Sequence, residues 1–311
     1  MLSLSRITPH LIIWLLSGLL CFLTPLHALA ADSLVVLSDF SPSYNRVLTA
    51  IRKHAARSPR VVTLDQLRTE DSRTPIILAV GTRACERMLS RYHPQSRLIC
   101  TFLPSATFKR LKQELLPQNS YAAVSAVFID QPLSRQIRLA RLIAPEASIL
   151  GSALGDNSLG LRQELQHSAR VENFELLMVE LAQRDNPVER LTPVIEGCDL
   201  FLVIPDSSVF NRAISKWLLY LALRHKIPVI GFSASYTSAG ATASVHSSPE
   251  QIGQQSAEWL NLLQRGGSLP PASYPYYFDV SVNPIAVRTL DIEPLSADAL
   301  RKELIRAEAG R

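Results

Sequence analysis

The chain is poor in the residues that build metal and nucleotide sites. Its 311 residues include only 4 cysteines, 7 histidines and 12 glycines. No cysteines are spaced as C-x-x-C and no histidines fall in H-E-x-x-H, so the sequence gives no support to a bound metal. Gly151, Gly155 and Gly160 do not match G-x-G-x-x-G, and G-x-x-x-x-G-K-[ST] does not occur. We therefore expect neither a metal nor a cofactor.

Charge of one sign is not in large excess either. The 32 lysines and arginines against 27 acidic residues give a net charge of +5, and the basic residues are scattered. Nucleic-acid binding would need a denser basic patch with aromatic platforms, so we expect no nucleic-acid partner. Arg135, Arg138 and Arg141 recur at every third position. We interpret them as one solvent-exposed helix face.

Long apolar runs are rare, and the one that stands out lies near the N-terminus. Leu11 to Leu26 is nearly all apolar but spans about sixteen residues, short of the ~20 needed to cross a bilayer. Ala28 and Ala30 supply the small residues that signal peptidase requires. We predict a cleaved signal peptide over residues 1–30 and a periplasmic location, with an uncleaved anchor as the alternative. Leu20 before Cys21 does not fit a lipobox, so we expect no lipid attachment.

The expected cleavage leaves an odd number of cysteines, so at least one thiol stays free. Cys85 and Cys100 could pair and close a loop of about fifteen residues, but sequence alone does not place their Cα atoms. Cys198 precedes an apolar run, and we expect it to be a buried small residue.

The chain is rich in short apolar runs, which alternate with segments of helical periodicity. The predicted strands cover residues 34–37, 60–64, 75–80, 97–102, 122–129, 148–154, 173–179, 199–204, 228–232, 241–245 and 276–282. The predicted helices cover residues 43–56, 82–92, 111–116, 132–143, 158–169, 187–196, 211–225, 249–265 and the charged tail after 296. This alternation predicts right-handed β-α-β units and parallel sheets.

The pattern restarts near Ala147, which indicates two units of the same kind. We therefore predict an α/β fold of two doubly wound parallel-sheet lobes joined by a hinge. The N-terminal lobe is expected to contain residues 31–145 and 247–281, and the C-terminal lobe residues 146–246 and 282–311.

Polar residues follow several of the predicted strands. In open parallel sheets, ligands bind beyond the carboxyl ends of the strands. That rule, with the resemblance given below, selects the candidate ligand-binding residues Ser38, Ser41, Gly81, Thr82, Phe102, Asn157, Ser158, Asp206, Ser207 and Ser233. Serine, threonine, aspartate and asparagine are also preferred helix N-caps, so capping and ligand contact stay open for each residue. As a set, they direct polar groups of both lobes at one cleft, which favours binding.

One segment is similar to a catalytic motif. Gly231–Ser235 reads GFSAS, which nearly matches the nucleophile elbow G-x-S-x-G but ends in serine. No clear helix is expected directly after it. We therefore expect no enzyme activity and keep an exported serine hydrolase that uses Ser233 as the last alternative.

Several segments, taken in order, carry a family resemblance. They are Ile77–Thr82 (ILAVGT), Asp130–Gln136 (DQPLSRQ), Asp156–Ser158 (DNS), Asp199–Val209 (DLFLVIPDSSV), Ile227–Gly231 (IPVIG), Ala239–Ala241 (AGA) and Asn283–Pro294. In this order and spacing, the chain resembles the substrate-binding proteins of ABC transporters whose characterised relatives bind tryptophan and other aromatic amino acids. Thr101–Pro104 (TFLP) lacks the acid of the family's TDP, and Leu290-Asp291-Ile292 replaces its Leu-Gly-Ile.

The resemblance implies a type I periplasmic binding protein fold, in which two lobes close on a hinge around one small molecule before docking to a membrane permease. It implies ligand contacts from Thr82 in the first lobe and from Asn157, Ser158, Asp206 and Ser207 in the second. Asp206 would face a ligand amine, and Thr82 and Ser158 a carboxylate.

On this basis we expect a monomeric solute-binding component of an ABC-type uptake system. Its ligand would be a small molecule such as an amino acid or a related carboxylate, and its partner a permease in the inner membrane. The alternative is a ligand-sensing or partner-binding module on the same scaffold.

Overall fold

The structure, a computed structural model, describes residues 32–293 and 296–309. The predicted signal peptide over residues 1–30 lies outside the described residues. Among the helices of the described part, none is long and apolar enough to cross a membrane.

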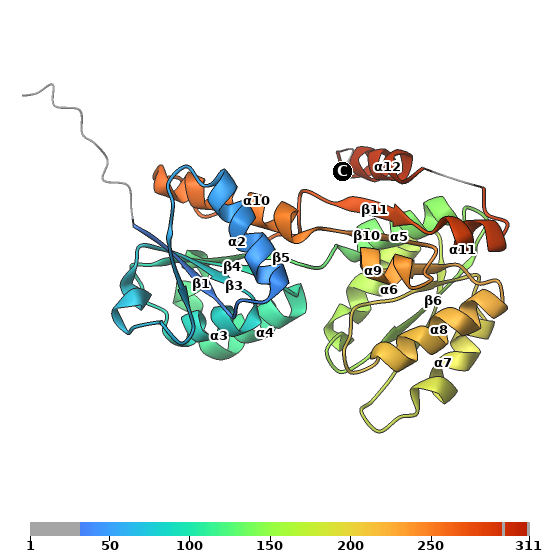
Figure 1. Cartoon of the computed structure of the whole chain (residues 1–311). Coiled ribbons are helices and arrows are strands. Elements are labelled where there is room, and N and C mark those ends of the chain that lie inside the picture. The colour runs from blue at the N-terminus through green and yellow to red at the C-terminus, as the bar shows by residue number, and fades with distance from the viewer. Residues whose placement is uncertain (1–31, 294–295, 310–311) are drawn as a thin grey trace, which may run out of the picture. The chain divides into compact units, whose positions relative to one another are not determined.

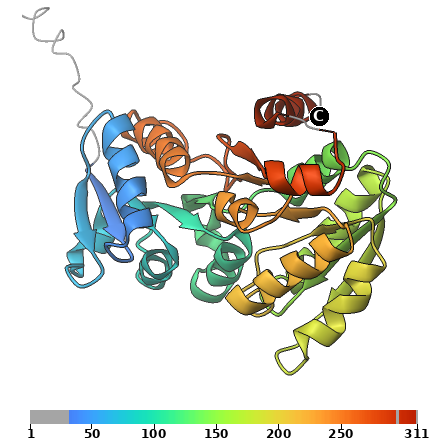
Figure 2. The same ribbon diagram turned by 45° about the vertical axis from the view of Figure 1, so that its right-hand side comes forward.

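The first sheet contains five parallel strands in the order β2-β1-β3-β4-β5 (Figure 1). In chain order they are β1 (Ser33–Leu37), β2 (Arg60–Thr63), β3 (Ile76–Val80), β4 (Arg97–Leu103) and β5 (Val124–Phe128). Apart from the half-buried Val61, their valine, isoleucine and leucine side chains are buried, as in parallel strands covered by helices on both faces. We call each sheet with its helices a unit. The helices of the first unit are α2 (Pro42–His54), α3 (Thr82–Ser90), α4 (Ser105–Leu115) and α10 (Pro249–Gln264). Although far apart in sequence, α2 and α10 lie side by side (Figure 2).

The second sheet contains six strands in the order β11-β10-β9-β8-β6-β7, in which β11 runs antiparallel to β10. The strands are β6 (Ile149–Leu154), β7 (Glu175–Glu180), β8 (Leu200–Leu202), β9 (Val229–Gly231), β10 (Ala243–His246) and β11 (Asp279–Val282). The helices are α5 (Leu133–Ile143), α6 (Arg162–Val171), α7 (Pro187–Glu196), α8 (Arg212–Arg224), α9 (Ala234–Ser238), α11 (Pro284–Thr289) and α12 (Ala297–Ala309). The α/β class with two mostly parallel sheets is confirmed.

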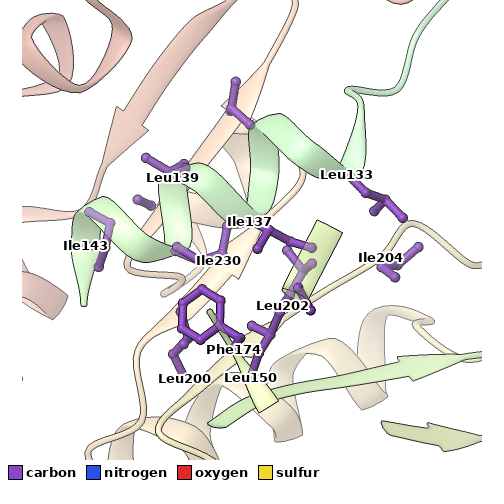
Figure 3. Packing of buried hydrophobic residues seen from close by; sticks show 14 of the residues in the cluster. Leu133, Ile137, Leu139, Ile143, Leu150, Phe174, Leu200, Leu202, Ile204 and Ile230 are labelled. Atoms are coloured by element: carbon purple, nitrogen blue, oxygen red, sulfur yellow. The ribbon is translucent and has the colours of Figure 1, made fainter. Parts of the chain in front are cut away.

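Helix α5 belongs to the second sheet. Its Ile137 and Ile143 share one buried cluster with Leu150, Leu202 and Ile230 of that sheet (Figure 3). The sequence-based boundary at residue 145 would have assigned α5 to the first lobe. The difference arises because periodicity shows that a helix has an apolar face, but not which sheet that face covers.

The chain therefore passes between the two units three times. The first crossing is residues 129–132, between β5 and α5, and the second is residues 247–248, between β10 and α10. The third is residues 265–278, between α10 and β11. Strand β11 pairs with β10, so residues 279–281 also lie in the second unit rather than in the first.

The predicted elements agree with most of those observed, and the differences are at short helices. Helix α4 begins at Ser105, well before residue 111, because its first turn carries small and polar residues with little apolar signal. Helices α9 and α11 were not predicted. Each starts at a capping side chain, Ser233 and Asn283 respectively, and each is too short for helical periodicity to develop.

The predicted exposed arginine face is wrong. The guanidinium of Arg135 is buried and donates to both carboxylate oxygens of Glu308, at 2.5 and 2.8 Å. Arg138 is paired with the buried Glu172. Arg141 donates to backbone carbonyls and lies 3.7 Å from the centre of the Phe174 ring. Arginine can occupy such positions because its planar donors find acceptors and its flat face stacks on aromatic rings.

The cysteines divide into one pair and one free thiol. Cys85 of α3 and Cys100 of β4 form a disulfide. Cys198, just before β8, is free and buried, as expected from the sequence. Burial raises the pKa of its thiol to about 12, so it stays protonated and unreactive at neutral pH.

Candidate ligand-binding site

A cavity of about 880 Å³ is lined by residues of both units and of the crossings. This volume lies in the range of pockets that hold small molecules. The first unit contributes Phe102, one residue before the end of β4, and the second contributes Asn157 and Asp206, which follow β6 and β8. Asp130 and Gln131 of the first crossing line the cavity as well. The cavity thus lies at the edge of both sheets that the strand-end rule selects.

The structure divides the sequence-predicted site residues into two groups. Five of them line this cavity: Phe102, Asn157, Asp206, Ser207 and Ser233. The other five are not among the lining residues: Ser38, Ser41, Gly81, Thr82 and Ser158.

The group around Gly81 holds the start of α3. The Ser38 hydroxyl donates to the Val80 carbonyl at 2.9 Å and accepts from the Ala84 amide at 3.0 Å, so it caps that helix from the end of β1. Gly81 has a φ of 89°, and a Cβ there would lie 2.6 Å from both the Ser38 and the Tyr44 hydroxyls. Tyr44 therefore occupies the space beside Gly81. For Ser38, the capping alternative is the one that the structure supports.

Asp206 organises the edge of the second sheet. Its Oδ2 accepts from Ser158 Oγ at 2.6 Å and from the Gly155 amide at 3.1 Å. Its Oδ1 accepts from Asn157 Nδ2 at 3.1 Å and from both the amide and the hydroxyl of Ser208. Burial alone would raise the pKa of Asp206, but the hydrogen bonds from Ser158, Ser208 and Asn157 hold the pKa below its usual value. Asp206 is thus an ionised anchor for two loops, with its oxygens occupied by protein donors.

Asp130 is a second carboxylate at the cavity, and the sequence analysis did not select it. It follows β5 on the first crossing and accepts from Ser105, whose amide is 2.8 Å from Oδ1 and whose hydroxyl is 2.5 Å from Oδ2. Burial raises the pKa of Asp130, and the nearby Glu164 carboxylate adds to this, while the Ser105 hydrogen bonds act in the opposite direction. Its position after a predicted strand was the signal that could have found it.

Aromatic rings form much of the apolar lining. Phe102 has a φ of 60°, which side chains larger than glycine rarely adopt, and the register of β4 with β5 shifts beside it. Its ring packs edge-on against Tyr44, with centroids 5.8 Å apart. Tyr274, Phe210 and Phe232 also line the cavity. Burial raises the pKa of Tyr274 to about 12, so its phenol is neutral. Strained backbone such as that of Phe102 is more common at functional sites than elsewhere.

Hydrogen bonds join all three crossings beside the cavity. Gln131 donates to Ser247 Oγ at 2.8 Å, and Ser247 donates to the Tyr277 carbonyl at 2.6 Å. Arg135 donates to Gln131 Oε1 at 2.5 Å and to the Pro275 carbonyl at 3.1 Å. Gln131 and Ser247 are themselves lining residues, so the cavity is directly connected to the crossings. Sequence reasoning missed both because they join segments that are distant in the chain.

Ser233 is the N-cap of α9, which corrects the expectation that no helix follows it. Its hydroxyl accepts from the Tyr236 amide at 3.1 Å and lies 3.0 Å from Ser235 Oγ. His246 lines the same cavity, but its Nε2 is 2.7 Å from Ser281 Oγ. Burial lowers the pKa of His246, with Asp279 acting in the opposite direction. Within the described residues, no histidine is hydrogen-bonded to Ser233, and no cluster of three potential metal ligands is present.

Comparison with known proteins gives matches at the level of structure. No family model and no curated protein matches the chain. The ligand-free, open structure of a substrate binding protein with adhesive properties from Clostridium difficile matches with a TM-score of 0.66 at 16% identity, covering 86% of this chain and 97% of the other. A conserved domain protein from Vibrio cholerae matches with a TM-score of 0.58 at 17% identity, with the same coverage. An ABC domain in complex with L-Trp from Streptococcus pneumoniae matches with a TM-score of 0.55 at 14% identity, covering 87% and 98%.

The chain has the type I periplasmic binding protein fold. At these identities the likeness concerns the fold. A repressor of the LacI family from Corynebacterium glutamicum also matches, so type I periplasmic binding protein folds are found in transport and in transcriptional control. The choice between such roles has to come from the site itself.

Proposed function

We propose that this chain is an exported solute-binding protein that captures one small molecule in the 880 Å³ cavity and delivers it to an ABC permease in the inner membrane. The observation that carries the proposal is the lining of the cavity. It brings together the carboxyl ends of strands of two mostly parallel sheets and residues of all three crossings between them. An amino acid or a related small carboxylate is the ligand class to test first.

Capture would follow from the arrangement of the lining residues. Phe102 of the first unit and Tyr274 of the third crossing offer apolar surface, and Asn157 and Ser207 offer hydrogen-bonding groups from the second unit. A ligand that touches both groups is bound more tightly when the two units approach each other. The crossings would absorb the change in backbone angles, as hinges do in domain closure.

A thermal-shift screen of residues 31–311 tests the proposal. The compounds are amino acids, sugars, peptides, nucleosides and small carboxylates. A ligand at 100 times its dissociation constant stabilises the folded state by about 2.7 kcal/mol, which raises the melting temperature by several degrees. A rise confined to one chemical class supports a solute-binding protein. No rise with any class contradicts it and favours the sensing or partner-binding alternative.

The hydrolase alternative has a separate test. Ser233 caps α9 and has no histidine bonded to it within the described residues, so we expect no turnover of generic esters. Ester hydrolysis that is lost in Ser233→Ala would overturn the binding proposal.

A further inference from the structure

The charged side chains that line the cavity differ in how well they are paired. Arg46 is paired with Glu250, to which its Nε and one terminal nitrogen donate at 2.6 and 2.8 Å. Asp206 accepts from five donors and has no free position for a further one in the plane of its oxygens. Asp130 has no cation beside it among the described residues. Asp206 has no cation beside it in this part of the chain either, so what distinguishes Asp130 is that its oxygens keep acceptor positions free.

The hydrogen bonding of Asp130 leaves room for a ligand. Ser105 uses one position on each carboxylate oxygen, and each oxygen can accept a second hydrogen bond. Asp130 is partly exposed, and the surface that remains open lines the cavity. A carboxylate enclosed by protein is unfavourable unless a cation pairs with it. The remaining positions on Asp130 thus suit a positively charged N–H donor.

The surroundings of Asp130 favour a cation as well. Tyr274 lies next to it, since the phenol oxygen is 3.5 Å from the same Ser105 hydroxyl, and both Tyr274 and Phe102 line the cavity. Aromatic faces attract cations because their π-electrons are negative. The carboxylate of Glu164 acts on both Asp130 and Tyr274 and so adds a second negative charge nearby.

We infer that Asp130 binds a cationic nitrogen of the ligand and makes the cavity specific for solutes that carry a protonated amine or a guanidinium group. The inference rests on the proposed function and names the charge its ligand must carry. It replaces the earlier expectation that Asp206 holds the ligand amine, because the oxygens of Asp206 are occupied by protein donors.

The test is a titration by calorimetry with two series of matched compounds. The aromatic series is 2-phenylethylamine, 3-phenylpropanoate and 2-phenylethanol, and the aliphatic series is pentylamine, hexanoate and pentanol. The proteins are the mature chain, Asp130→Asn and the control Asp156→Asn, which changes an exposed carboxylate at the sheet edge that does not line the cavity. Asparagine at 130 can still hydrogen-bond to Ser105, so the melting temperature of the Asp130→Asn variant should not fall below that of the parent chain.

The expected result is that an amine binds at least about tenfold more tightly than the acid and the alcohol of its series. Asp130→Asn should lose about tenfold or more in affinity for that amine, whereas Asp156→Asn should bind like the parent chain. Preference for an acid or an alcohol, or an unchanged affinity in Asp130→Asn, overturns the inference.

The wider solute screen separates failure of the inference from failure of the proposed function. If the chain binds an uncharged solute such as a sugar but neither amine, the inference fails and the solute-binding function stands. If no compound of any class binds, both fail.

Discussion

Asp130 and Asp206 both follow a strand of a parallel sheet, yet their carboxylates have different environments. Five protein donors surround Asp206, while Asp130 accepts from the amide and the hydroxyl of Ser105. The sequence could place Asp206 at the edge of its sheet, because strand ends are visible as the end of an apolar run. It could not show which lone pairs are filled, because the donors Gly155, Asn157 and Ser158 come from a different loop.

Replacing each of the two aspartates by asparagine should have a different effect on stability at neutral pH. The pKa of Asp206 is lowered, so its stabilisation is present above the unfolded value near 3.9 and is lost as the pH falls through the folded pKa. The pKa of Asp130 is raised, so stability falls as the pH rises from the unfolded value through the folded pKa. At pH 7 we expect Asp206→Asn to lose about 1–3 kcal/mol in the free energy of unfolding, and Asp130→Asn to lose nothing or to gain. Urea unfolding measures both, and equal losses would contradict this account.

At the scale of elements, the buried strands were the easiest to predict from sequence, because parallel strands covered on both faces are continuous apolar runs. The sequence analysis missed the short helices α9 and α11, and it assigned α5 to the first lobe although α5 packs on the second sheet. Arg135 was misread because its partner helix α12, which packs on α5, comes from the far end of the chain, and Arg138 because its partner Glu172 lies 34 residues away. Arg135 connects α5, α12 and the crossings through Glu308, Gln131 and the Pro275 carbonyl.

Arg135→Met should therefore be strongly destabilising. The change keeps the apolar stem but removes the donor from the buried Gln131 and Pro275 acceptors and the cation from Glu308, which costs on the order of 3 kcal/mol. Arg110→Met is the matched control, because Arg110 and Glu114 form an exposed pair on one helix. Such pairs contribute less than about 0.5 kcal/mol. Chemical denaturation measures both variants, and a similar small loss in each would show that the Arg135 contacts are not important for stability.

The disulfide between Cys85 and Cys100 also acts at this scale, since it joins α3 to β4 over a sequence separation of 15 residues. Closing such a loop stabilises by about 3 kcal/mol in the chain-entropy model. We expect the Cys85→Ser, Cys100→Ser double variant to melt well below the parent chain. The expectation is wrong if the double variant melts at the same temperature as the parent chain and if reductant leaves the melting temperature of the parent chain unchanged.

For the whole molecule, the account depends on one cavity that both units share. The fold could be predicted because alternating strands and helices allow few topologies. Five of the ten residues predicted for the candidate site line the cavity, because strand ends mark the edge of a sheet, and the same rule could have found Asp130. Gln131 and Ser247, which lie on the crossings, could not be predicted, because their closeness depends on a hydrogen bond between distant segments. No local pattern reports such contacts.

The most direct test fills that cavity. Ser207→Trp places a large side chain at a lining position, while Ser238→Trp places the same side chain at an exposed position of α9 that does not line it. The measurement is a calorimetric titration of the best solute from the screen into the parent chain and both variants. We predict one molecule bound per chain, a loss of about tenfold or more in affinity for Ser207→Trp, and no change for Ser238→Trp. Unchanged binding to Ser207→Trp would show that the solute binds elsewhere and would contradict the central claim.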